Sequence, residues 1–198
     1  MESTEIILNK AEKLFADSGF GSVSMTNIAK ACNMSKANLY HHFSSKEDLY
    51  MQILIRAQRN TQNILEKTKE ITGTYIKKIE FFINEHLNQM LKDPMKYKLL
   101  AREFSDLGLS SRAMPSVGLM EQNLSQIVDL IDQAKNTGEI IEGADSRLLA
   151  YQLLSPNLTY ITHLNFFDSV FEGLGPSSNK NFSKTLTANL LRGVKRND

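Results

Sequence analysis

Residues 24–43 read SMTNIAKACNMSKANLYHHF. Ser24 is a favoured N-cap residue for a short helical segment that follows it. Asn33 comes next, and asparagine tolerates the left-handed backbone of a tight turn. Ser35 then caps a second short helix, Lys36 to about Phe43. The stretch therefore predicts two short helices joined by a tight turn.

Further helical patterns lie on both sides of this pair. Before it, residues 3–18 carry one apolar stripe, and Gly19 follows where a C-terminal cap belongs. After it, residues 44–47 read SSKE, the pattern of a capping box that begins a longer helix. Three short helices followed by a long one, with the second and third joined by a tight turn, have the dimensions of a helix-turn-helix DNA-binding unit.

The rest of the chain repeats the helical pattern. Apolar residues recur at intervals near 3.6, and no alternating run is long enough for a sheet. We therefore expect an all-α protein of about nine helices: an N-terminal three-helix helix-turn-helix DNA-binding domain, residues 1–48, and a C-terminal helical bundle, residues 49–198. The later helices are expected over residues 75–91, 94–104, 117–135, 146–167 and 181–194, with loops at 108–115 and 168–178.

Composition limits the class of protein. The chain has 198 residues, of which 41% are hydrophobic and 23% charged, as in a folded globular protein. Cys32 is the single cysteine, so a disulfide framework is excluded and a cytoplasmic location is expected. Charged residues interrupt the N-terminus, which excludes an export signal. The longest uncharged stretch, residues 148–167, carries polar residues and Pro156, so we expect a buried helix and no membrane partner.

Charge is concentrated locally and not over the whole chain. The formal net charge of +1 gives no general attraction to nucleic acid. From Ser18 through Lys46, however, there is no aspartate or glutamate, and this window contains five basic or histidine side chains: Lys30, Lys36, His41, His42 and Lys46. Any nucleic-acid site is therefore expected within this window.

The same window closely resembles the tetracycline-repressor (TetR) family of bacterial transcriptional regulators. The resemblance covers roughly residues 5 to 55 and rests on Phe15, Gly19, the Ile28-Ala29 pair, Ser35-Lys36, residues 39–43 (LYHHF) and residues 46–49 (KEDL). Two positions depart from the family, which usually has glycine where this chain has Asn33 and often where it has Ala37. The resemblance implies a repressor that a small hydrophobic effector releases from a palindromic operator.

Individual DNA-binding residues can be named within the motif. The first residues of a recognition helix reach base edges, which makes Lys36, Ala37 and Asn38 the candidates for base contacts. The resemblance implies that Thr26, Ser35, Tyr40, His41 and Lys46 bind the DNA backbone. For His42, packing and DNA contact are equally open.

An effector pocket is expected in the C-terminal domain, where polar residues lie among apolar ones. The candidates are His86, Met90, Arg102, Asn123, Asn157, Tyr160 and His163. Arg102 would pair with a carboxylate if the effector is anionic; the alternative is a surface ion pair with Glu103 or Asp106. His86 and His163 have the alternative of being core histidines with hydrogen-bond partners.

No pattern in the sequence indicates catalysis, a cofactor or a metal site. Neither a nucleophile elbow, nor a phosphate-binding glycine loop, nor a zinc-binding His-Glu-x-x-His motif is present. We expect a homodimer through the last two long helices, because residues 146–167 are apolar around most of the helix and Phe182, Leu186 and Leu190 form a second stripe. The alternative class is a helical ligand-binding or scaffold protein that has lost DNA recognition.

Overall fold

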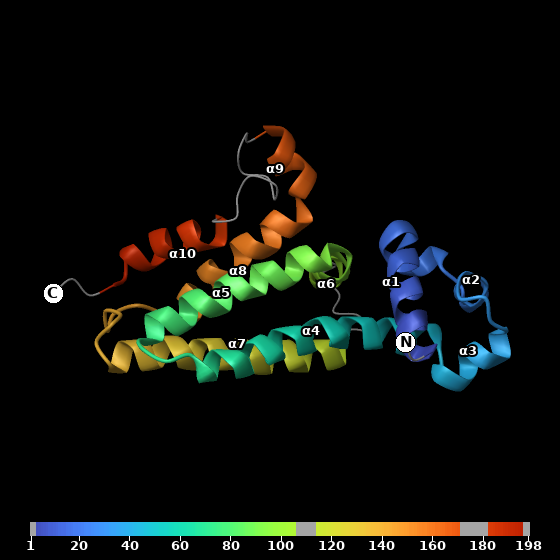
Figure 1. Cartoon of the computed structure of the whole chain (residues 1–198), viewed down its shortest axis with the longest axis horizontal. Helices are drawn as coiled ribbons and strands as arrows, with labels where there is room; N and C mark the ends of the chain where they lie inside the picture. The colour runs from blue at the N-terminus through green and yellow to red at the C-terminus, as the bar shows by residue number, and fades with distance from the viewer. Residues whose placement is uncertain (1–2, 106–113, 171–181, 196–198) are drawn as a thin grey trace. The chain divides into compact units, whose positions relative to one another are not determined.

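The computed structural model describes residues 3–105, 114–170 and 182–195. Within these residues the chain forms helices and no strand, which confirms the all-α prediction; one isolated bridge joins Ile140 and Lys195. Most of the expected loops at 108–115 and 168–178 lies outside the described residues. The loop predictions are wrong at their described ends, because residues 114–115 begin a helix and residues 168–170 end one. The helices are α1 (Ser3–Ser22), α2 (Met25–Ala31), α3 (Lys36–His42), α4 (Lys46–Glu70), α5 (Tyr75–Lys92), α6 (Pro94–Ser105), α7 (Met114–Asn136), α8 (Ser146–Thr162), α9 (Leu164–Val170) and α10 (Phe182–Arg192) (Figure 1).

The described residues form ten helices where about nine were expected. The difference arises in the helix predicted over residues 146–167. α8 continues through Pro156 but ends at Thr162, where the backbone N–H of His163 closes the last turn on Thr159. Residues 164–170 then form the separate helix α9.

Two compact units divide the chain. Unit 1 contains residues 1–59 and 95–119, and unit 2 contains residues 60–94 and 120–198. The helix α4 supplies residues to both units. The boundary expected at residue 48, between the DNA-binding domain and the C-terminal helical bundle, stays a prediction.

The core of unit 1 holds the first three helices against the start of α4. In this core the buried ring of Phe15 and the half-buried ring of Phe20 both lie against Tyr50, with ring centroids 5.0 and 4.9 Å from that of Tyr50. The Tyr50 hydroxyl donates to the buried carboxylate of Glu103 on α6 at 3.0 Å. The packing of this core therefore holds α2 and α3 in position.

Unit 2 is built around α5, which lies beside α8 and α10 (Figure 1). Its apolar core includes Ile79, Phe82 and Ile83 from α5, with Leu149 and Leu153 from α8. Glu139, which lies far from α5 in the sequence, stabilises the first turn of that helix. Its carboxylate accepts hydrogen bonds from the backbone N–H groups of residues 75 and 76 at 3.0 and 2.9 Å. None of the described helices has both the length and the apolar character needed to cross a bilayer.

Candidate DNA-binding interface

Local hydrogen bonds build the turn between α2 and α3 as the sequence predicts. Ser24 caps α2 by accepting from the backbone N–H of Asn27 at 3.1 Å, and the Asn27 side chain accepts from the Ser24 N–H at 2.9 Å. Asn33 has a φ of 53°, the one positive φ among the described non-glycine residues. Ser35 caps α3 by accepting from the Asn38 N–H at 3.1 Å. These bonds set the direction of α3 relative to α2.

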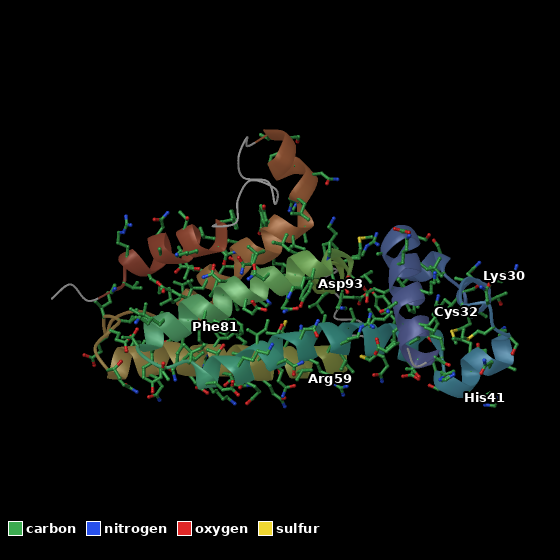
Figure 2. All side chains as sticks on the ribbon, in the orientation of Figure 1. Lys30, Cys32, His41, Arg59, Phe81 and Asp93 are labelled. Atoms are coloured by element: carbon green, nitrogen blue, oxygen red, sulfur yellow. The ribbon has the colours of Figure 1, made fainter. Side chains whose placement is uncertain are left out.

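The two short helices have one buried side and one exposed side. Ile28, Leu39 and Phe43 are buried in unit 1. Seven of the eight predicted DNA-binding residues are exposed: Thr26, Ser35, Lys36, Ala37, Asn38, Tyr40 and His41. Figure 2 labels His41 on α3 together with Lys30 on α2, which is also exposed. The motif therefore presents a continuous set of polar and basic side chains to solvent.

Lys36 and Tyr40 lie one helical turn apart and contact each other. The Lys36 ammonium is 5.8 Å from the centre of the Tyr40 ring, and Tyr40 is 45% exposed. Tyr40 is therefore not a core residue of unit 1. The Ser35 hydroxyl uses its oxygen for the cap, so its proton is available to donate to a phosphate.

Lys46 differs from the other seven residues because its side chain is half-buried. Its ammonium donates to the Phe20 carbonyl at 2.9 Å and lies 4.2 Å from the centre of the Phe20 ring. An ammonium has three donors, so a phosphate contact remains open to this residue, although one donor is used within the fold. His42 is exposed, and its Nδ1 lies 3.2 Å from the Thr4 hydroxyl.

Two groups near this motif are not among the predicted DNA-binding residues. Lys30 belongs to the acid-free window, and its exposure on α2 makes it a further cation for a DNA backbone. Arg102 lies on α6 in unit 1, where its guanidinium nitrogen comes within 3.5 Å of the position that a Cβ on Gly19 would take. No local pattern could have predicted this contact, because the two residues are far apart in sequence.

The comparisons with known proteins agree with this motif. The family described as "Bacterial regulatory proteins, tetR family" matches residues 7–53. The HTH-type transcriptional regulator UidR of Escherichia coli (strain K12) is 30% identical over 160 residues, which cover 78% of this chain and 76% of UidR. The chain belongs to the TetR family. A shorter match, 41% identical over 46 residues, relates 23% of this TetR-family chain to 25% of the biofilm operon negative regulator IcaR of Staphylococcus aureus (strain Newman).

Solved TetR-type structures share the fold along the whole chain. The ketosteroid transcriptional regulator KstR2 of Mycobacterium tuberculosis superposes with a TM-score of 0.79 at 16% identity, covering 99% of this chain and 96% of KstR2. The fatty acid degradation regulator FadR of Bacillus halodurans gives 0.79 at 19% identity, covering 99% and 98%. At these identities the likeness establishes the fold and nothing finer.

The predicted effector residues of this TetR-family chain separate into two groups. Five are buried in unit 2: His86, Met90, Asn123, Asn157 and Tyr160. Arg102 is exposed and belongs to unit 1, and Glu103, its expected ion-pair partner, accepts from Tyr50. His163 is exposed at the end of α8, where its Nδ1 lies 3.0 Å from the Thr159 carbonyl.

His86 lies in the interior of unit 2. Its ring stacks on Phe82 with the centroids 5.6 Å apart. Burial disfavours the charged imidazolium and lowers the pKa of His86 to about 4. The side chain is therefore neutral at pH 7.

Proposed function

We propose that this TetR-family regulator is a cytoplasmic repressor that binds a palindromic operator as a homodimer and leaves it when a small hydrophobic molecule binds. Residues 1–48 read the DNA, and residues 49–198 form the dimer and hold the effector. The observation that carries the proposal is the exposed side of α2 and α3, which joins hydroxyl, amide and basic side chains in a window without acidic residues. The match to IcaR, a negative transcriptional regulator, supports the choice of repression.

Specific contacts follow from the positions of the side chains. Lys36, Ala37 and Asn38 occupy the first turn of α3 and read base edges in the major groove. Thr26, Ser35, Tyr40, His41 and Lys46 hold the DNA backbone, which fixes the register of α3 but carries no sequence information directly.

The dimer forms through α8 and α10. Leu148 and Tyr151 on α8 are 55% and 66% exposed, an unusual exposure for large apolar side chains one helical turn apart. On α10 the predicted stripe of Phe182, Leu186 and Leu190 is only half-buried in one copy of the chain. A second copy would cover both surfaces.

The coupling between effector and operator runs through α4. This helix places Leu49 and Ile53 in the core of unit 1, and Ile64 and Leu65 in the core of unit 2. An effector that favours one dimer geometry moves the two recognition helices away from the spacing of about 34 Å that successive major grooves require.

The proposal is tested with fluorescently labelled DNA from the region upstream of the protein's own gene. We expect Lys36→Ala to weaken operator binding by about 1 to 3 kcal/mol, because it removes a side chain that reads a base edge. Asn38→Ala should instead reduce the discrimination between operator and mutated sites, by about 1 to 3 kcal/mol. Lys77→Ala, which removes an exposed lysine of α5 outside the DNA-binding and dimer surfaces, is the matched control and should bind as the parent does.

Circular dichroism establishes that each variant is folded. Unchanged operator binding by folded Lys36→Ala and Asn38→Ala would place the interface elsewhere. If the parent bound no fragment at all, the chain would be a helical ligand-binding protein without DNA recognition.

A further inference from the structure

The inner face of α10 is polar where the sequence pattern predicts an apolar one. Ser183 and Thr187 are buried at 4% and 1% exposure, on the same side of the helix as Leu191. The apolar residues Phe182, Leu186 and Leu190 are half-buried instead. A buried hydroxyl requires a hydrogen-bond partner, so this face calls for polar groups opposite it.

One such group is the carbonyl oxygen of Ile83 on α5. The Ser183 hydroxyl donates to it at 3.2 Å, and the side-chain amide of Asn157 on α8 donates to it at 3.0 Å. Three helices therefore meet at one backbone oxygen. This contact also fixes the orientation of the Asn157 amide, because only its nitrogen can donate to a carbonyl.

Two buried polar atoms in this region have no partner among the described residues. The Oδ1 atom of Asn157 is one, and Asn157 is fully buried. The hydroxyl of Thr187 is the other, one helical turn beyond Ser183. The amide oxygen can only accept a hydrogen bond, whereas the hydroxyl can donate or accept. Each of the two atoms can accept a hydrogen bond from a ligand group that donates one.

No charged residue is among the fully buried residues of unit 2 that the structure describes. The buried polar residues of unit 2 that the structure describes are Thr61, Thr68, His86, Asn123, Ser146, Asn157, Ser183 and Thr187. Because burial lowers the pKa of His86 to about 4, this residue is neutral as well. The buried charged residues Glu12, Lys96 and Glu103 all belong to unit 1.

We infer that Asn157 and Thr187 are the polar contacts of the effector site, and that the effector is an uncharged apolar molecule with a hydroxyl or N–H group that donates to Asn157. This inference rests on the proposed function and names the chemical class of its ligand. A carboxylate would be desolvated here beside an amide oxygen with no buried cation in the described part of unit 2, which is strongly unfavourable. Arg102, the candidate partner for an anionic ligand, lies in unit 1.

The inference is tested on the full-length protein with three probes of similar size: 1-octanol, its isomer 1-methoxyheptane, and octanoate. Binding is measured by isothermal titration calorimetry at pH 7.5. We expect 1-octanol to bind about tenfold more tightly than the ether, which cannot donate a hydrogen bond. We expect octanoate to bind at least about a hundredfold more weakly than the alcohol.

Variants assign the preference to the named side chains. Asn157→Leu and Thr187→Val should remove the advantage of the alcohol over the ether. Ser183→Ala is the matched control, since its hydroxyl donates to the same carbonyl, and it should retain that advantage. Thr187→Val should also raise the melting temperature, because it removes a buried hydroxyl that has no partner in the absence of ligand.

Each result has a defined meaning. Octanoate binding as tightly as 1-octanol, or a Thr187→Val protein that is less stable and keeps the preference, would overturn the inference. No binding of 1-octanol would overturn it too. Operator binding is measured separately on the same preparations, so an intact operator complex in any of these cases would leave DNA regulation standing.

Discussion

His86 shows how the position of one residue determines a pH dependence. Its folded pKa of about 4 lies below the value of 6.5 that an exposed histidine has. Between these values the unfolded chain binds a proton that the folded protein does not bind. The free energy of unfolding should therefore fall as the pH is lowered from about 6.5 to 4, by roughly 3 kcal/mol in total.

Urea unfolding at a fixed protein concentration, from pH 7.5 down to pH 4.5, measures this dependence. His86→Phe keeps an aromatic ring against Phe82 but has no proton to bind, so its stability should vary much less over the same range. A parent and a variant with the same slope would show that His86 is not the group responsible.

The residues of the candidate site differ in how well the sequence predicts them. Exposure of Lys36, Asn38 and His41 follows from the helical period, because Leu39 must face the core. The contact of Lys46 with Phe20 does not follow, because it joins residues 26 positions apart. The placement of Arg102 in unit 1 depends on the packing of α6, which no local pattern records.

The sequence predicts where a helix starts when the residue that caps its first turn lies within four residues of that start. Ser24, Ser35 and Asp145 cap α2, α3 and α8 as the sequence indicates. At α4 the pattern was offset by one residue, since Ser45 accepts from the Asp48 N–H at 3.0 Å while the Asp48 carboxylate accepts from Ser44. Thr74 caps α5 locally, but the bonds from the N–H groups of residues 75 and 76 to Glu139 join residues 64 and 63 positions apart, so no local pattern predicts them.

The end of α1 depends on a glycine at one position. Gly19 has φ 76° and ψ 159°, a region of backbone conformation that is essentially restricted to glycine. It breaks the helix before Phe20, whose ring packs on Tyr50 and whose carbonyl accepts from Lys46. Gly19→Ala should lower the free energy of unfolding by about 1 to 3 kcal/mol, measured by urea denaturation.

Gly21 in the same helix provides the matched control. A Cβ added there would meet no atom within 4 Å. Gly21→Ala should leave stability unchanged or raise it by up to about 1 kcal/mol, because alanine restricts the unfolded chain more than glycine does. If both variants lost the same stability, the loss would come from adding a side chain to this end of α1 and not from the backbone conformation of Gly19.

At the scale of the whole molecule, the proposed function requires two copies of the chain. A palindromic operator offers two half-sites, and a dimer that binds both gains far more affinity than one recognition helix provides. The exposed apolar residues Leu148 and Tyr151 are the part of α8 that a second copy would bury. Oligomeric state and operator affinity should therefore change together.

Tyr151→Glu tests this link, because it places a charge in the centre of the proposed dimer surface, where a second copy of the chain would desolvate it. We expect light scattering to report a mass near the 22.4 kDa of one chain, against twice that value for the parent. Affinity for the full operator should fall by about a hundredfold or more, while the weak affinity for a half-site is retained.

Ile141→Glu, at another exposed apolar residue that lies outside α8 and α10, should remain dimeric and bind the operator normally. A Tyr151→Glu protein that stays dimeric would assign the interface to another surface, and a monomer with full operator affinity would separate DNA binding from dimerisation altogether.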